Sequence, residues 1–147
     1  MKTAQNRSSL YHAVALLGGL LCCLASNHAR AQTPLTGIAK IAAGNGHTCA
    51  TTLSGGVKCW GSDLYGQLGI NNPLLGVSRV ALDVQGLGGA VSAIAPAGAH
   101  TCALTTSGGV QCWGNNDLAG QLGNNSSINE RIPVDVTTPN NGTPNNG

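Results

Sequence analysis

The polar and apolar positions of this 147-residue chain predict short β-strands rather than helices. Beyond an apolar run near the N-terminus, no segment repeats apolar residues at a helical spacing. Apolar and small residues instead occupy both alternating positions of short runs, a pattern typical of sheets covered on both faces. The chain is therefore predicted to be all-β. The predicted strands span residues 39–44, 47–52, 57–61 and 80–87, and then 91–98, 100–106, 110–114 and 132–136.

The two sets of predicted strands belong to an internal repeat. AGNGHTCATTLSGGVKCWGSDLYGQLG begins at Ala43, and AGAHTCALTTSGGVQCWGNNDLAGQLG begins at Ala97. A period near 53 residues suits a repeat array or a propeller blade and excludes a coiled-coil heptad. One residue is inserted in the second copy between Trp113 and Gly120. The recurring residues are His47, Cys49, Cys59, Trp60, Gly66, Gln67, Leu68 and Gly69, matched by His100, Cys102, Cys112, Trp113, Gly120, Gln121, Leu122 and Gly123.

The N-terminal segment has the layout of a secretory signal peptide. A basic start is followed by the uncharged run AVALLGGLLCCLA and by an A-x-A pattern at Ala29 and Ala31. We therefore expect residues 1–31 to be removed, leaving a chain that starts at Gln32. A membrane anchor is the alternative, although the run is short for a span of about 20 residues. The mature protein is expected to be secreted, periplasmic or at the cell surface, without a membrane attachment.

Composition narrows the classes of partner and the source of stability. Four Lys or Arg and five Asp or Glu residues remain after Ala31, which gives a net charge of −1. No basic patch survives, so a nucleic-acid partner is not expected. The mature part has no Phe, and its aromatic residues are Trp60, Tyr65 and Trp113. A core this poor in large side chains needs covalent staples, neighbouring copies or a partner.

The four cysteines beyond the signal are expected to form two cross-strand disulfides. If Thr52 and Gly56 close a hairpin with a three-residue loop, counting outward places one cysteine directly opposite the next. Non-hydrogen-bonded pairs have Cα atoms about 4.5 Å apart, which a disulfide can span. An even number of cysteines in an exported chain also favours disulfides, each stabilising the fold by about 2–3 kcal/mol. The expected pairs are Cys49–Cys59 and Cys102–Cys112.

Three alternatives for these cysteines are weaker. His47, Cys49 and Cys59 could supply zinc ligands, but structural zinc sites usually space paired ligands by two to four residues. A redox-active site usually carries C-x-x-C, which is absent from the mature part. A bridge between repeats, such as Cys49 to Cys102, is open but lacks the hairpin register. We therefore expect no metal and no cofactor.

The repeated motif resembles that of a known family. A strand ending in A-G, then H-x-C-A-L-x-x-S-G-G-V-x-C-W-G, then N-x-x-G-Q-L-G, resembles the RCC1 (regulator of chromosome condensation) repeat, and the cysteine pair is similar to its secreted bacterial branch. The resemblance implies two four-stranded propeller blades, a partial propeller, at residues 38–90 and 91–137, before a low-complexity, disordered tail at 138–147. Because family rings usually have seven blades, we expect a fragment, a short member, or copies that assemble to complete a propeller.

Other repeated residues have both structural and functional interpretations. His47 and His100 could be bases or ligands, but a structural hydrogen bond to a neighbouring loop is favoured. The tryptophans could stack on a sugar, but packing between blades is favoured. Gly66–Gly69 could be a phosphate loop, yet no Lys or Ser/Thr follows it, and the resemblance implies a blade turn. Asp63 and Asp117 could form a carboxylate pair, but solvated or turn-capping side chains are more usual.

These observations predict a binding scaffold for protein partners rather than an enzyme. No arrangement of catalytic acid, base and nucleophile can be assembled, so no catalytic residue is expected. The resemblance implies two further functions: a secreted propeller that inhibits β-lactamase, and guanine-nucleotide exchange on the Ran GTPase. Exchange is not carried over, because the chain is expected to be exported and no matching exchange residues can be identified from two repeats. Specificity is expected in the segments that differ between repeats, 62–66, 70–77, 115–120 and 124–130.

Overall fold

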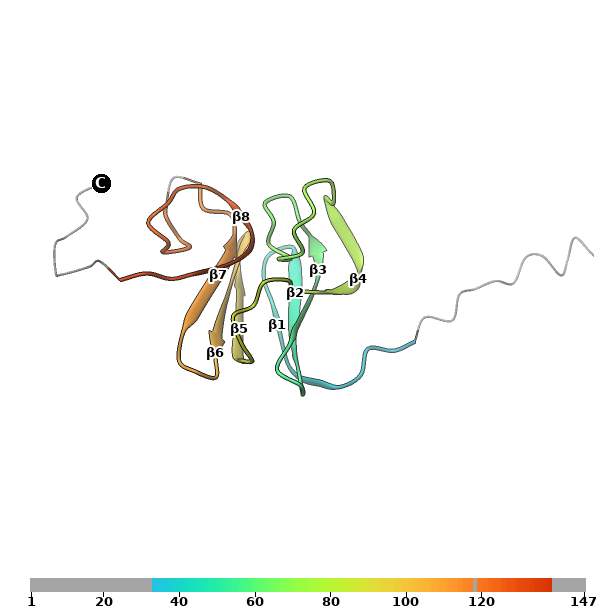
Figure 1. The fold of residues 1–147 in the computed structure, drawn as a ribbon. Helices are drawn as coiled ribbons and strands as arrows, with labels where there is room; N and C mark the ends of the chain where they lie inside the picture. Colours follow the sequence, from blue (N-terminus) through green and yellow to red (C-terminus); the bar gives the residue numbers. More distant parts are fainter. Residues whose placement is uncertain (1–32, 118, 139–147) are drawn as a thin grey trace, which may run out of the picture. The chain divides into compact units, whose positions relative to one another are not determined.

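The described residues form two four-stranded antiparallel sheets (Figure 1). A computed structural model describes residues 33–117 and 119–138, so the predicted signal peptide and most of the predicted tail lie outside the described residues. The strand orders are β1-β2-β3-β4 and β5-β6-β7-β8, which confirms the all-β prediction. The strands are β1 (Ile38–Ala43), β2 (His47–Thr52), β3 (Val57–Ser62), β4 (Val77–Asp83), β5 (Val91–Ala97), β6 (His100–Thr105), β7 (Val110–Gly114) and β8 (Glu130–Asp135).

The central hairpin of each sheet closes at the turn that the sequence predicts. The Thr52 amide donates to the Gly56 carbonyl oxygen at 2.8 Å, and Gly55 has a φ of 85°. Glycine suits this position because a residue with a side chain is strained in the left-handed backbone conformation. The turn fixes the register, so Cys49 pairs with Cys59, at a Cα–Cα distance of 4.1 Å. The second hairpin repeats the turn, the register and the 4.1 Å distance at Cys102–Cys112.

Both disulfides therefore lie within a sheet, between its second and third strands. The alternative of a bridge between the repeats is wrong, because the hairpin register already brings each cysteine to its neighbour. The paired sulfurs also leave no cysteine in the described residues free to bind zinc as a thiolate.

The fourth strand of each sheet begins earlier than the apolar pattern predicts. Strand β4 starts at Val77 rather than residue 80, because Val77 and Ser78 pair with Ser62 and Gly61 of β3. It ends at Asp83 rather than residue 87, since the Gln85 amide turns away to bond the Gly69 carbonyl oxygen. Strand β8 likewise spans Glu130–Asp135 rather than 132–136. Pairing partners, rather than apolar residues, set these bounds.

The core lies between the two sheets, where β5 packs against β1 and β2. The face of the second sheet that points away from the first is open. Val57, on the shared face, is 2% exposed, whereas Val110 at the matching position of the second sheet is 40% exposed. The expectation of sheets covered on both faces is therefore wrong for this outer face. The core residues are Cys49, Val57, Cys59, Leu68, Ile70, Val91, Ala103 and Trp113.

No helix in the part of the chain that the structure describes has the length and apolar character needed to span a bilayer.

We predict that the two disulfides contribute unequally to stability. Cys49 and Cys59 are fully buried in the core between the sheets, whereas Cys102 is half-buried on the outer face of the second sheet and Cys112, although 2% exposed, lies outside that core. Replacing Cys102 and Cys112 together by Ala should lower the free energy of unfolding by about 2–3 kcal/mol through the loss of loop closure. Replacing Cys49 and Cys59 together should cost more, because packing between the sheets is also lost. Denaturant unfolding of the two double variants measures both costs, and equal costs would contradict the burial argument.

Candidate functional site

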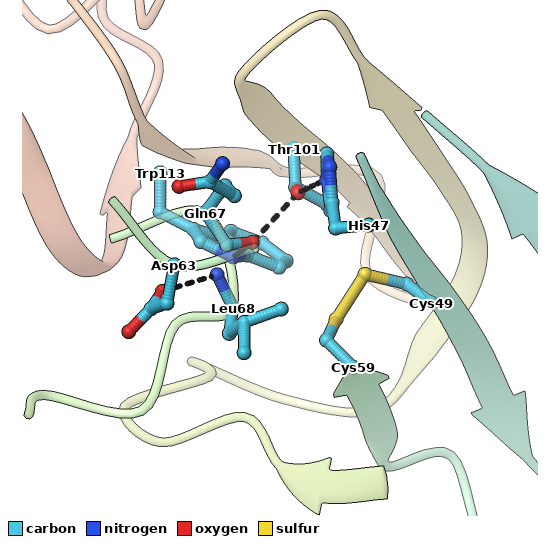
Figure 2. The surroundings of a disulfide bond; sticks show 8 residues. All are labelled: His47, Cys49, Cys59, Asp63, Gln67, Leu68, Thr101 and Trp113. Atoms are coloured by element: carbon cyan, nitrogen blue, oxygen red, sulfur yellow. Dashed lines mark hydrogen bonds between the residues drawn. A yellow bond between two sulfur atoms is a disulfide. The ribbon is translucent and has the colours of Figure 1, made fainter. Parts of the chain in front are cut away.

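A buried polar network joins the two sheets (Figure 2). His47 Nε2, from β2, lies 2.8 Å from the Thr101 hydroxyl oxygen, from β6. The Thr101 hydroxyl donates to the carbonyl oxygen of Gln67, which lies in the loop after β3, at 3.0 Å. Trp113 Nε1, from β7, donates to the same carbonyl oxygen, also at 3.0 Å. The Gln67 carbonyl thus accepts two hydrogen bonds from the second sheet, which accounts for both of its lone pairs.

The network fixes the tautomer of His47. Because the Thr101 hydrogen points to Gln67, His47 must donate through Nε2–H, which leaves Nδ1 unprotonated in the neutral ring. Nδ1 is buried and has no hydrogen-bond partner in the described part of the chain. Burial, and to a lesser extent the nearby His100, lowers the pKa of His47. His47 therefore serves as a neutral donor that holds the sheets together.

The Gly66–Gly69 segment forms the turn that presents the Gln67 carbonyl. The Gly69 amide donates to the Gly66 carbonyl oxygen at 3.0 Å, and the Leu68 side chain is fully buried. Gly69 has a φ of 70°, and a Cβ there would lie 2.8 Å from Trp113 Nε1. Only glycine combines this conformation with room for the indole. The segment thus acts as a packing turn between sheets.

The Asp63 side chain stabilises this turn through a hydrogen bond. Its Oδ1 accepts a 2.9 Å hydrogen bond from the Leu68 amide, and the residue is 1% exposed. Oδ2 has no partner in the described residues, and burial raises the pKa of Asp63 against the opposing effects of the Leu68 amide and Arg131. Asn116 is the equivalent in the second sheet, where it accepts from the Leu122 amide at 2.9 Å.

The two aspartates singled out from the sequence are not equivalent. Asp63 is buried and caps a turn, whereas Asp117 is exposed and accepts hydrogen bonds from Asn115 and Asn129. A shared carboxylate pair is therefore wrong. The residue inserted after Trp113 shifts the apparent alignment by one, so the counterpart of Asp63 is Asn116.

The repeated residues are distributed asymmetrically. Trp113 is fully buried between the sheets, but Trp60 is half-buried on the outer face of the first sheet. His47 is buried, whereas His100 is half-buried on the outer face of the second. In the second Gly-Gln-Leu-Gly turn, Leu122 is buried, Gly120 is exposed, and Gln121 and Gly123 are half-buried. Thr101 did not stand out in the sequence, although its repetition with Thr48 inside H-T-C was a usable signal.

The loops after β3 and β7 lie at the same end of the two sheets (Figure 1). The Asn71 amide donates to the Arg131 carbonyl oxygen at 3.1 Å, which ties the loop after β3 to strand β8. The first loop exposes apolar side chains, whereas the second is rich in Asn and Ser. We call the apolar part the loop patch; it consists of Leu64, Tyr65 and Leu74 in the loop, together with Val77 at the start of β4. The sequence located these loops but did not reveal that most of their exposed apolar side chains lie in the first; among the described residues of the second loop, Ile128 is 69% exposed.

Within the described ranges, no three His, Cys, Asp or Glu side chains gather as a metal site would require. The arrangement offers hydrogen bonding between sheets and an exposed apolar loop surface.

We predict that the Thr101 hydroxyl contributes to stability out of proportion to its size. Thr101→Val keeps the shape but leaves the Nε2–H of His47 buried without an acceptor, so unfolding should become easier by about 1–3 kcal/mol. Thr48→Val is the matched control, because Thr48 is half-buried and has no side-chain hydrogen bond within the described residues. The control should cost about 0.5 kcal/mol or less. Denaturant unfolding of dilute protein compares them, and equal costs would refute the role of the network.

We also predict a pH-dependent effect of Asp63→Asn. The raised pKa means that the folded state binds more protons at Asp63 than the unfolded state, so wild-type stability falls as pH rises from 3.8 through the folded pKa. Asn keeps the acceptor for the Leu68 amide but cannot ionise, as Asn116 shows in the second sheet. The free energy of unfolding of the variant minus that of the wild type should therefore increase with pH. Asp117→Asn on the exposed loop is the control, and a difference that is flat or falls with pH would disprove the prediction.

Known proteins share both the motif and the fold. Residues 38–67 and 98–121 match the Regulator of chromosome condensation (RCC1) repeat. The chain is 35% identical over 96 residues to the probable E3 ubiquitin-protein ligase HERC4 of Homo sapiens, which covers 65% of this chain and 9% of that protein. It is 34% identical over 102 residues to the ultraviolet-B receptor UVR8 of Arabidopsis thaliana, covering 69% of this chain and 22% of that protein.

Solved structures show the same fold. Human WBSCR16 superposes with a TM-score of 0.63 at 22% identity, over 72% of this chain and 27% of that one. Prp20p from Saccharomyces cerevisiae gives a TM-score of 0.63 at 18% identity, over 74% of this chain and 27% of that one. The chain spans only a minor part of these relatives. Motif, sheet topology and superposition agree that it carries two repeats of the RCC1 family, one in each four-stranded sheet.

Proposed function

We propose that this chain is a secreted scaffold that binds a protein partner through the loop patch. The observation that carries the proposal is the exposure of Leu64, Tyr65 and Leu74 on loops that are fixed to a disulfide-bonded frame. Leu74 is 93% exposed and Leu64 68% exposed, so neither contributes much to the core. Apolar and aromatic side chains clustered on a surface are typical of protein interfaces.

The loops are held by hydrogen bonds from buried groups, which supports a binding role. The Asp63 amide donates to the Gly76 carbonyl oxygen at 2.9 Å, joining the two segments that carry the patch. The Tyr65 amide donates to the Gln67 side-chain oxygen at 2.9 Å. Loops ordered before binding lose less conformational entropy when a partner docks. The frame thus favours recognition by a preformed surface.

Two observations support export. The N-terminal segment has the sequence layout of a signal peptide, and two disulfides are typical of proteins that fold in an oxidising compartment. The relatives named above include a ubiquitin ligase and an ultraviolet-B receptor, functions too different to be transferred by fold. An inhibitor of a secreted enzyme is a special case of the proposed scaffold, in which the partner is that enzyme. Nucleotide exchange is not proposed.

The proposal predicts that a partner contacts the loop patch. The protein is collected from the culture medium of its expression host, where a mass that starts at Gln32 with both disulfides intact supports export. A photo-reactive amino acid is then placed at Leu74, and separately at Leu53 as a control. Leu53 is also highly exposed but lies in the β2–β3 turn, away from the patch. A protein cross-linked from position 74 and not from position 53 supports the proposal.

Affinity for that partner provides the quantitative test. Leu64→Ser combined with Leu74→Ser should weaken binding by about tenfold or more, because both apolar contacts are lost. Leu53→Ser should leave the affinity unchanged. Cross-linking from position 53 alone, or unchanged affinity of the patch variant, would place the binding surface elsewhere.

A further inference from the structure

The interface between the two blades is built from two different halves. We call the sheet of β1–β4 blade 1 and that of β5–β8 blade 2. Blade 1 contributes the His47 ring and the Gln67 carbonyl, and blade 2 contributes the Thr101 hydroxyl and the Trp113 indole. Thr101 and Trp113 are direct partners across β6 and β7, so the two donors reach the Gln67 carbonyl together.

Each half occurs a second time on an outer face. Thr48 and Trp60 are direct partners across β2 and β3, in the same register as Thr101 and Trp113. They lie half-buried on the outer face of blade 1, without a side-chain hydrogen bond in the described part of the chain. On the outer face of blade 2, His100 stands at the position of His47, and Gln121 at that of Gln67. The chain therefore carries one donor face and one acceptor face.

The residues around the acceptor face are also buried between the blades in one copy of the repeat and exposed on the outer face in the other. In blade 1, Thr51 and Val57 are each 2% exposed because blade 2 covers them. Their counterparts Leu104 and Val110 are 42% and 40% exposed on the outer face of blade 2. This face is more apolar than its internal equivalent, since Leu replaces Thr. Exposed apolar area of this kind favours burial against another surface.

We propose that a second copy of this chain docks head to tail, with its blade 1 covering the outer face of blade 2. In that complex, the Thr48 hydroxyl and Trp60 Nε1 of the partner copy donate to the Gln121 carbonyl oxygen, and His100 donates to Thr48. Gly123 stands at the position of Gly69, which leaves space for the indole of Trp60. The occupant is a second copy because its own outer face supplies both donors in the register that the internal interface uses.

The interface is heterologous, because different faces of the two copies meet. One free donor face and one free acceptor face remain at the ends of each dimer, so further copies can add until a ring closes. Lys58 stands where Gln111 accepts from the Gly88 amide, so this internal hydrogen bond has no counterpart between copies. The interface between copies therefore lacks one hydrogen bond that the internal interface has. It is independent of the loop patch, which lies on the loops at the ends of the strands.

The test uses two variants of the exported chain that each block one face. Thr48→Arg blocks the donor face, and Val110→Arg blocks the acceptor face. By sedimentation velocity, the wild type should form species of increasing mass as its concentration rises, whereas each variant alone stays monomeric. An equimolar mixture should form a heterodimer and nothing larger, because only one pair of free faces remains. Leu53→Arg, in the exposed β2–β3 turn, should associate like the wild type.

A milder variant keeps the test decisive if an arginine variant fails to fold. Trp60→Phe removes the indole N–H from the outer face, where Trp60 is already half-buried, and should weaken association by about tenfold. A wild type that stays monomeric at all concentrations overturns the proposal. Arginine variants that dimerise alone also overturn it, because they indicate a symmetric interface. Association unchanged by Trp60→Phe overturns the donor assignment.

Discussion

The Gln67 carbonyl oxygen is the point on which the arrangement of the two sheets depends. It accepts hydrogen bonds from the Thr101 hydroxyl and the Trp113 indole, and Thr101 in turn accepts from His47. A buried carbonyl without partners is costly, so the sheets are held at the one separation that satisfies it. Gly69 permits this separation, since a side chain there would collide with the indole.

The disulfides and the polar network compensate for different weaknesses of the same small core. Trp113 is the one large aromatic side chain fully buried among the described residues. The Cys49–Cys59 and Cys102–Cys112 bridges each cross-link two strands of one sheet. They stabilise the fold by lowering the conformational entropy of the unfolded chain. The Gln67 network acts between the sheets, where apolar area is limited. Covalent and polar contacts together replace packing that a larger core would supply.

The division of roles between core and loops is consistent with a binding scaffold. Side chains that repeat between the blades, such as Trp113 and Gln67, lie at the interface or in the turn that serves it. Side chains that differ, such as Tyr65 and Leu74, lie on the exposed loops. Recognition residues can vary on such a frame without disturbing the contacts that hold it.

The sequence by itself determined the strands, the hairpin register and the cysteine pairs. These features are local: alternation, a turn closed by Thr52 and Gly56, and a count of three residues outward suffice to place Cys49 opposite Cys59. The bounds of β4 were harder to predict from the sequence, because its pairing partners Gly61 and Ser62 are distant in sequence.

Only the tertiary structure decided which copy of each repeated residue is buried. The sequence treats Trp60 and Trp113 as equivalent, as it does His47 and His100. Among the residues that the structure describes, each sheet has a neighbour on one face only, so Trp113 and His47 are enclosed, while Trp60 and His100 lie on outer faces. It also revealed that Asn116, rather than Asp117, corresponds to Asp63, since both accept the amide hydrogen of a buried leucine. Burial depends on what packs against a residue, and a local motif does not contain that information.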